Sequence, residues 1–137
     1  MAKPLTIAAA FVALIALAVP AIAEGERELG PDAVLLTGND LAAALTDVTA
    51  EGWSFDGNTW FWFTEHYMTD GSIVGSGGPD EGSDAWQWDG NWRAEAAQAC
   101  FEYPALGSGA CRQIYVENGV YKNVADGNVR AFWQPME

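Results

Sequence analysis

The sequence predicts an all-β domain, a small antiparallel meander that closes into a lipocalin-like barrel or a sandwich and carries one short N-terminal helix. Aromatic and β-branched residues alternate with polar ones through much of the second half, as strands with one buried face require. Tight-turn dipeptides interrupt these runs and favour type I′ hairpins. They begin at Asp56, Asp70, Asp89, Asn118 and Asp126. A meander of seven or eight such strands must close on itself to bury one face.

The first residues of the chain carry the features of a secretory signal peptide, which we place at 1–23. Lys3 supplies a basic start, an apolar run occupies residues 5–19, and Ala21-Ile22-Ala23 forms a small-x-small cleavage site. The run is shorter than the roughly 20 apolar residues that a membrane-spanning helix needs. We therefore expect cleavage before Glu24, no membrane span in the mature chain, and a periplasmic or secreted location.

Residues 24–37 are acidic, contain Gly and Pro, and predict a loose arm ahead of a single β domain at 38–137. A short amphipathic helix begins this domain. Asn39 or Asp40 can cap its first turn, and its apolar residues recur at the spacing of one helix face. These apolar residues are Leu41, Leu45 and Val48. The sequence Glu51-Gly52 ends the predicted helix after about three turns.

Residues 59–67 form the longest predicted strand, and side chains alternate between its two faces. One face carries Trp60, Trp62, Thr64 and His66, and the other carries Phe61, Phe63, Glu65 and Tyr67. Both faces begin with aromatic residues, so we expect the strand to be covered on both sides.

Two-residue turns at the Asp-Gly and Asn-Gly sites would fix the register of the neighbouring strands. The cross-strand pairs predicted in this way are Phe55–Asn58, Tyr67–Val74, Val116–Tyr121 and Val124–Val129. The glycine-rich residues 75–84 have no periodicity and predict a surface loop.

Cys100 and Cys111 are the two cysteines of the chain. In an exported protein they are expected to form a disulfide. A hairpin that turns over residues 104–109 places them directly opposite one another, as a cross-strand bridge requires. A metal or catalytic role would need further ligands or a nearby base, which two isolated cysteines do not supply.

Removal of the signal peptide leaves five basic residues against 19 acidic ones, a net charge of −14. Such a surface repels nucleic acid and anionic lipid, so neither is an expected partner. The charge favours a basic protein as a partner, or it serves solubility alone.

The seven tryptophans are the strongest hint of a function. Exposed aromatic rings on a sheet form flat platforms for sugar rings or for a protein interface. The candidate binding residues are Trp60, Trp62, Trp86, Trp88, Trp92 and His66. The alternative is that the indole rings fill the core, because Leu and Ile are scarce after residue 53.

No pattern of residues selects a catalytic or cofactor site, and we expect no cofactor. His66 lies beside Glu65, but alternation directs neighbouring side chains to opposite faces of a strand, which argues against acid–base catalysis. Asp80, Glu81 and Asp84 offer hard oxygen ligands and are candidate Ca²⁺ ligands, although they also fit a solvated acidic loop. The sequence contains no nucleophile-elbow, phosphate-loop or zinc-protease motif.

Residues 36–133 resemble a group of small exported alphaproteobacterial proteins that form a family of unknown function. The matching segments are Leu36-Thr37-Gly38-Asn39-Asp40-Leu41, Glu65-x-Tyr67-x-x-Asp70-Gly71-Ser72, Gly90-x-Trp92, Cys100-Phe101, Cys111 and Asp126-Gly127. The resemblance implies a secreted β-barrel-like domain and transfers no catalytic residue. It also implies that Asp89-Gly90 is a β-bulge rather than a turn, with residues 94–98 as the next connection. The extra tryptophans and the acidic residues 78–84 depart from the family pattern.

We therefore expect an exported acidic binding or interaction module whose partner is a basic protein or a glycan, a role that fits the sequence better than catalysis does. The alternatives are a small hydrolase-type enzyme that uses carboxylates and a structural component of an envelope assembly. A pocket with two carboxylates would favour the hydrolase, and a large exposed apolar patch would favour the assembly role.

Overall fold

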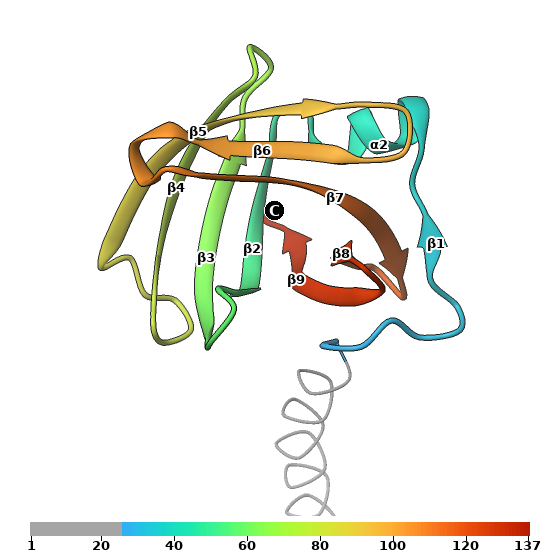
Figure 1. The fold of residues 1–137 in the computed structure, drawn as a ribbon, viewed down its shortest axis with the longest axis horizontal. Helices are drawn as coiled ribbons and strands as arrows, with labels where there is room; N and C mark the ends of the chain where they lie inside the picture. Colours follow the sequence, from blue (N-terminus) through green and yellow to red (C-terminus); the bar gives the residue numbers. More distant parts are fainter. Residues whose placement is uncertain (1–25) are drawn as a thin grey trace, which may run out of the picture.

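The computed structural model describes residues 26–137, so the predicted signal peptide lies outside the described residues. Within them, antiparallel strands form a closed barrel in which each strand pairs with the next and the last returns to the first (Figure 1). Its eight strands are β2 (Val48–Phe55), β3 (Trp60–Tyr67), β4 (Ser72–Gly78), β5 (Trp86–Ala94), β6 (Ala99–Tyr103), β7 (Ser108–Glu117), β8 (Val120–Ala125) and β9 (Asn128–Pro135). This confirms the predicted meander and selects the barrel over the sandwich.

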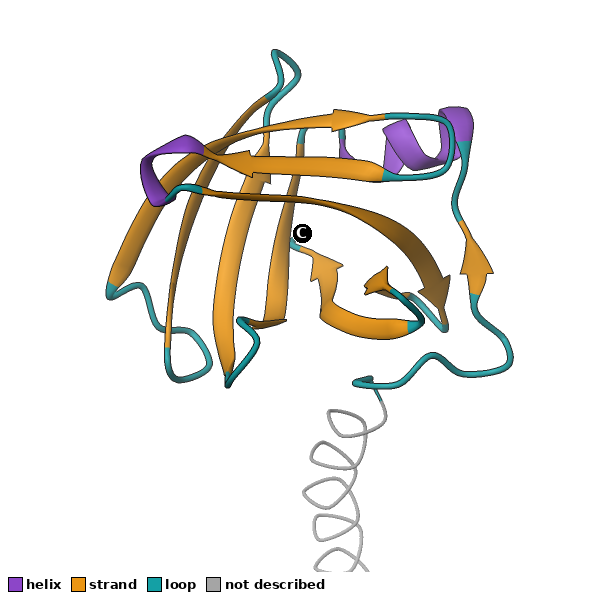
Figure 2. Ribbon diagram, viewed as in Figure 1, coloured by secondary structure: helices purple, strands orange, loops and turns teal. Residues whose placement is uncertain are grey.

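Two helical segments lie at opposite ends of the barrel (Figure 2). They are the helix α2 (Gly38–Leu45) and the 3-10 turn η1 (Pro104–Leu106). Leu41 and Leu45 of α2 are fully buried and join the barrel core. The helix therefore plugs one end. No helix among residues 26–137 has the length and hydrophobicity to cross a membrane.

The helix is shorter than the sequence pattern predicts. Val48 belongs to β2, because the backbone of Thr46 is extended and Asp47 has a positive φ of 55°. The β-branched residues that follow Leu45 also favour a strand over a helix.

The two faces predicted for β3 are confirmed. Phe63, Glu65 and Tyr67 are buried inside the barrel, and the alternate residues face outward. Aromatic and aliphatic side chains fill the half of the barrel next to α2. The buried members of this core are Leu41, Leu45, Ala50, Phe63, Tyr67, Ile73, Ala99, Phe101, Ile114, Ala131 and Trp133.

The two later hairpins have the predicted registers. Val116 pairs with Tyr121 and Val124 pairs with Val129. Positive φ values at both residues of each turn, 52° and 80° in Asn118-Gly119, match the type I′ geometry.

The two earlier hairpins differ from the prediction. Phe55 pairs with Trp60 instead of Asn58, since the Asp56 carboxylate accepts hydrogen bonds from the backbone N–H groups of Asn58 and Thr59 and makes a longer turn. A shift of two residues keeps every side chain on its predicted face. Tyr67 pairs with Ile73 instead of Val74. This one-residue difference puts Ile73 inside and leaves Val74 half-exposed outside.

The segment around Asp89-Gly90 lies in the middle of β5 and is neither a turn nor a bulge. Its pairing with β4 continues without a register shift. The connection at residues 94–98 is confirmed by the hydrogen bond from the Glu95 N–H to the Gln98 carbonyl, 2.8 Å. Strand β4 extends through Gly78, so the predicted loop at 75–84 is confined to the residues after it.

Cys100 and Cys111 form the predicted disulfide across β6 and β7, with their Cα atoms 3.9 Å apart. The strand residues on either side of them point into the barrel, so the bridge lies on its outer face.

The predicted loose arm is attached to the barrel, beginning with Glu26 and Glu28, which both contact Lys122 of β8. Its strand β1 (Val34–Leu35) pairs with β7, and the N–H groups of Gly30 and Asp32 donate to the Glu117 carboxylate. The buried Lys122 explains this difference. Its ammonium group donates to the Glu28 carbonyl of the segment and to the Glu117 carboxylate.

Candidate functional site

The half of the barrel away from α2 contains a cavity of about 700 Å³. The turn between β2 and β3, the start of β5 and the segment around η1 surround it. Aromatic side chains from three strands, β3, β5 and β6, supply most of its apolar wall. They are Phe61, Phe63, Trp86, Trp88, Phe101 and Tyr103. The cavity is therefore an extension of the barrel interior that side chains leave unfilled.

Glu65 forms the polar floor of this cavity, where the cavity meets the packed core. Its carboxylate accepts three hydrogen bonds. Oε1 accepts from the Tyr67 hydroxyl at 2.8 Å, and Oε2 accepts from Trp88 Nε1 at 2.8 Å and from the Tyr103 hydroxyl at 2.7 Å. Side chains from three strands thus converge on one carboxylate, and both of its oxygens are occupied.

The buried environment shifts the pKa values of all three titratable groups, Glu65, Tyr67 and Tyr103. Burial raises the pKa of the Glu65 carboxyl, and the three hydrogen bonds oppose this effect only in part. Burial and the neighbouring carboxylate also raise the pKa of Tyr67 and Tyr103 well above the usual range. Both phenols therefore remain hydrogen-bond donors at neutral pH.

Glycines in β4 make room for Trp88. Gly75 lies directly opposite Trp88 in the β4–β5 ladder. A Cβ atom added to Gly75 would overlap the indole nitrogen, and one added to Gly77 would meet the far edge of the same ring. The ring therefore lies flat over these two glycines, which lets its N–H reach Glu65.

Gly75→Ala is expected to destabilise the protein by about 2 kcal/mol, as overpacking of a filled core does. The added methyl group displaces the indole and breaks its bond to Glu65. Urea unfolding measures the loss, and near-UV circular dichroism reports the movement of the indole. Ser76→Ala, at the next and outward-facing position, is the control. Equal stability of the two variants would show that the indole does not depend on the glycine.

Arg112 of β7 and Arg130 of β9 line the same cavity. The Arg130 Nε is buried and has no hydrogen-bond partner among the described residues. Arg112 donates from one terminal nitrogen to the Cys111 carbonyl, 3.1 Å away. Burial, followed by repulsion from Arg130, lowers the pKa of Arg112. The two guanidinium groups are therefore close enough to repel one another.

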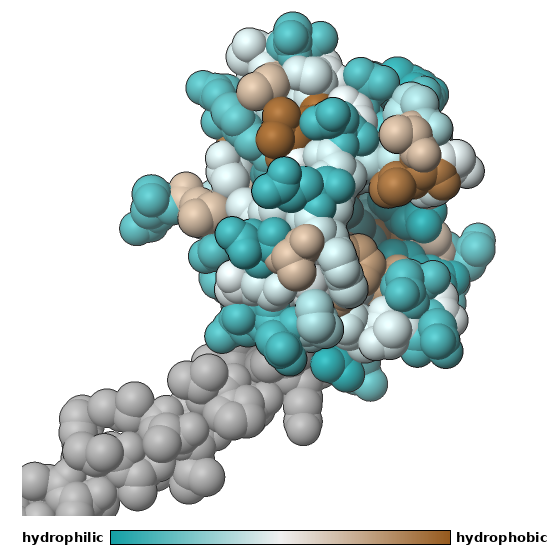
Figure 3. All heavy atoms as spheres, turned by 90° about the vertical axis from the view of Figure 1, so that its left-hand side faces the viewer, coloured by the Kyte–Doolittle hydropathy of each residue, from teal (hydrophilic) through white to brown (hydrophobic). Residues whose placement is uncertain are grey.

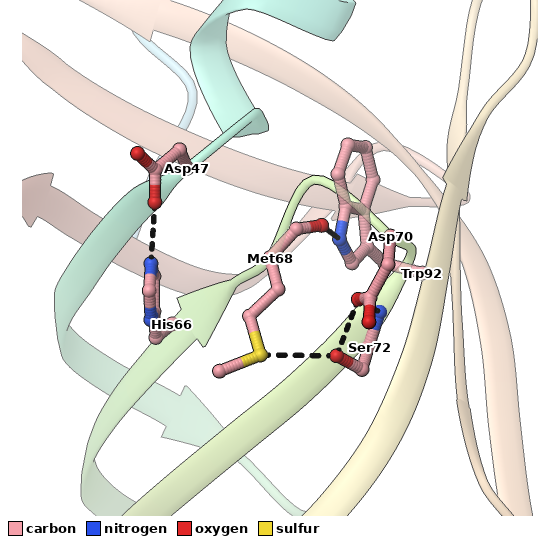
Figure 4. A network of polar contacts seen from close by, with 6 residues as sticks. All are labelled: Asp47, His66, Met68, Asp70, Ser72 and Trp92. Atoms are coloured by element: carbon pink, nitrogen blue, oxygen red, sulfur yellow. Dashed lines mark hydrogen bonds and ion pairs between the residues drawn. The ribbon is translucent and has the colours of Figure 1, made fainter.

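The structure divides the candidate binding residues into three places. Trp86 and Trp88 line the cavity, and Trp86 is 49% exposed at its mouth. Trp92 points into the half of the barrel next to α2, where its Nε1 donates to the Met68 carbonyl at 2.8 Å (Figure 4). Trp60 and Trp62 lie on the outside of β3.

Trp60 and Trp62 belong to an aromatic cluster on the outer surface. Trp60 packs 5.6 Å from Phe132, and Trp62 packs edge-on at 5.6 Å against Trp53. The guanidinium carbon of Arg27 lies 5.1 Å from the centre of the Trp60 ring. These rings pack against each other and against the N-terminal segment, so they are half-buried and present no open flat platform.

His66 also lies outside the barrel and does not contribute to the cavity. Its Nε2 is 2.9 Å from Oδ1 of Asp47, at the turn that follows α2 (Figure 4). This pairing fastens β3 to the end of the helix and leaves no contact with Glu65.

Asp80, Glu81 and Asp84 are exposed in the loop between β4 and β5. Within residues 26–137, no three Asp, Glu, His or Cys side chains converge into an arrangement that could hold a metal ion.

The alternation of β3 predicts the face of Glu65 correctly, but no sequence pattern distinguishes Glu65, Arg112 or Arg130 as site residues. The alternation of β7 contains the relevant signal, because a cysteine that faces outward at 111 sends the side chain at 112 into the barrel. Comparison with family models, curated proteins and solved structures finds no match for the chain. The resemblance to the alphaproteobacterial family stays a prediction.

Proposed function

We propose that the protein is an exported binding protein that holds a small molecule inside its barrel. The observation that carries this proposal is the aromatic-walled cavity of about 700 Å³. Its volume falls within the range of about 300–1,000 Å³ that is typical of small-molecule sites, which are likewise mainly apolar with a few polar groups. The disulfide supports an oxidising compartment outside the cytoplasm.

The carboxylates of the cavity favour binding over hydrolysis. Glu65 has both oxygens occupied by donors from the protein. Asp56 also lines the cavity, but its Oδ1 accepts from the backbone N–H groups of Asn58 and Thr59 at 2.8 and 2.7 Å. A pair of carboxylates that hydrolyses a glycoside needs one free acid and one free base or nucleophile. Glu65 has no oxygen free of a protein donor, which leaves Asp56 alone and not the pair of free carboxylates that this reaction needs.

The outer surface gives less support to the other partners that the sequence suggests. The face shown in Figure 3 is largely hydrophilic, with small separate hydrophobic areas. The exposed large apolar residues come from different elements and are Val34, Val74, Trp86, Leu106 and Met136. Such scattered residues do not favour the assembly role. A basic protein and a glycan stay predictions that follow from charge and tryptophan content.

Filling the cavity tests the proposal. Ala110 of β7 lines the cavity and is the cross-strand partner of Phe101 in β6. Ala110→Trp therefore places an indole ring inside the cavity. We expect the neutral fluorophore N-phenyl-1-naphthylamine to bind the natural protein with enhanced emission, and Ala110→Trp to weaken this binding at least tenfold. Gln113→Trp adds the same side chain to the outer face of β7 and should leave binding unchanged.

Two results would contradict the proposal. One is the absence of probe binding to the natural protein. The other is equal binding by the two tryptophan variants, because the probe would then lie outside the barrel. Near-UV circular dichroism of each variant establishes that the fold is retained.

A further inference from the structure

We propose that the ligand of the barrel is a small organic anion with an apolar or aromatic body, and that Arg112 and Arg130 together bind its carboxylate or phosphate group. This inference rests on the proposed function, since it names the chemical class of the molecule that the cavity holds. Three features of the cavity support an anion: its positive charge, its unsatisfied donor and its largely aromatic wall.

Every other basic residue of the mature chain already has a partner outside the barrel interior. Arg93 forms ion pairs with two glutamates, and Lys122 does so with two others. Arg27 lies over a tryptophan ring. Arg112 and Arg130 form no ion pair within residues 26–137, although the chain has 19 carboxylates. Arg27 also lacks an ion pair but lies over the Trp60 ring, so Arg112 and Arg130 are the described cations with neither an acidic nor an aromatic partner, and both line the cavity.

Among residues 26–137, the two carboxylates that line the cavity, Glu65 and Asp56, form no ion pair with these arginines. Glu65 is held by its three donors, and Asp56 is held by the turn between β2 and β3. Asp126 attracts Arg112 electrostatically but makes no ion pair with it among the described contacts. The buried Arg130 Nε remains without a hydrogen-bond partner. A buried donor next to a second cation is unfavourable unless a bound group accepts a hydrogen bond from it and balances the charge.

The carboxylate or phosphate group of a ligand would accept the hydrogen bond and balance the positive charge. Guanidinium groups donate two parallel hydrogen bonds to a carboxylate or phosphate, in a planar geometry that a single point charge cannot reproduce. Repulsion between Arg112 and Arg130 in the empty cavity becomes attraction toward the bound group. The remaining wall consists mainly of aromatic rings, which favours an apolar or aromatic body for the rest of the molecule.

The net charge of the protein makes this inference easy to test. A chain with a net charge of −13 repels anions at long range, so a nonspecific electrostatic effect would favour a neutral ligand over an anion. A preference for the anion must therefore come from a local site. Three naphthyl compounds of similar size serve as probes: 2-naphthylacetate, 2-naphthyl phosphate and the neutral 2-(2-naphthyl)ethanol.

Isothermal titration calorimetry compares the three compounds on the full mature protein. We expect at least one of the two anions to bind at least tenfold more tightly than the alcohol, and the stronger of them identifies the preferred headgroup. Arg112→Gln with Arg130→Gln should reduce the affinity for that anion to the level of the alcohol and leave the alcohol unchanged. Arg93→Gln removes one positive charge outside the barrel and should change neither affinity.

The possible failures separate the two proposals. Equal affinity of the natural protein for anions and alcohol would overturn the anion site while leaving a small-molecule cavity intact. Binding of N-phenyl-1-naphthylamine without binding of any naphthyl anion would do the same. Failure of every compound, including that fluorophore, would overturn the proposed function itself. The comparison on the natural protein stands even if the double variant does not fold.

Discussion

Glu65→Leu is expected to destabilise the barrel by about 4 kcal/mol, because it leaves three buried donors without an acceptor. The donors are the hydroxyls of Tyr67 and Tyr103 and the indole N–H of Trp88. Leu is close to Glu in size, so loss of packing contributes little to this effect. Urea unfolding of the variant and of the natural protein measures the difference.

Glu65→Gln is the matched control, and it should cost only about 1 kcal/mol. The amide oxygen can accept from Trp88 and Tyr103, while the amide nitrogen donates to the Tyr67 hydroxyl oxygen. All three neighbours then keep a partner. Equal losses in Glu65→Leu and Glu65→Gln would mean that the carboxylate charge, and not the set of hydrogen bonds, holds the floor of the cavity.

The natural protein and Glu65→Gln should differ in the pH dependence of their stability. Burial raises the pKa of Glu65 above its usual 4.5, so the folded protein binds this proton more tightly than the unfolded chain does. The stabilisation that this bound proton gives is complete below the pKa of Glu65 in the unfolded chain. It is lost as the pH rises through the pKa of Glu65 in the folded protein. The advantage of the natural protein over Glu65→Gln should therefore shrink as the pH rises from the usual pKa of 4.5 through the raised pKa of the folded protein. Parallel stability curves would contradict the raised pKa.

The hairpin registers show how far local sequence determines this fold. The Asn118-Gly119 turn could be predicted because two adjacent residues suffice to favour positive φ. Asp56-Gly57 looks the same in sequence, but there the Asp56 side chain bonds the backbone and lengthens the turn. A dipeptide cannot reveal which of these two local solutions the chain adopts.

The candidate site could be predicted less well than the barrel because its parts come from strands that are distant in sequence. The residues Gly75 and Gly77 look like loop residues until Trp88 is placed opposite them. Arg112 and Arg130 meet only because β9 returns to close the barrel between β2 and β8. Alternation gives the face of each side chain, but the closure decides which inward-facing side chains share a cavity.

Lys122→Ala is expected to destabilise the protein by about 3 kcal/mol, as removal of one partner from a buried ion pair does. Lys122 is 2% exposed. Its Nζ donates to Oε1 of Glu117 and to the carbonyl of Glu28, each at 2.7 Å, and lies 3.3 Å from a carboxylate oxygen of Glu26. Removal of the ammonium group therefore leaves the buried Glu117 carboxylate without its cation and releases the N-terminal segment. Urea unfolding measures the loss.

Release of this segment has its own signature. In the natural protein, the N–H groups of Gly30 and Asp32 donate to Glu117 at 3.1 and 3.2 Å. Hydrogen exchange at these two amides should accelerate in Lys122→Ala more than exchange in the barrel core does. Arg93→Ala, which removes an exposed ion-paired cation, should leave both amides protected. Unchanged exchange at Gly30 and Asp32 in Lys122→Ala would show that the segment is held by other contacts.

Acidification should weaken the attachment through Lys122 and Glu117, whereas it should stabilise the floor of the cavity at Glu65. The hydrogen bond from Lys122 lowers the pKa of Glu117, so the stabilisation it gives is present above the unfolded pKa and is lost as the pH falls through the folded pKa. Glu65 has the opposite sign, because burial raises its pKa. The stability difference between the natural protein and Lys122→Ala should therefore shrink on acidification, whereas the difference from Glu65→Gln should grow. If both differences changed in the same direction, one of the two glutamates would have been assigned the wrong environment.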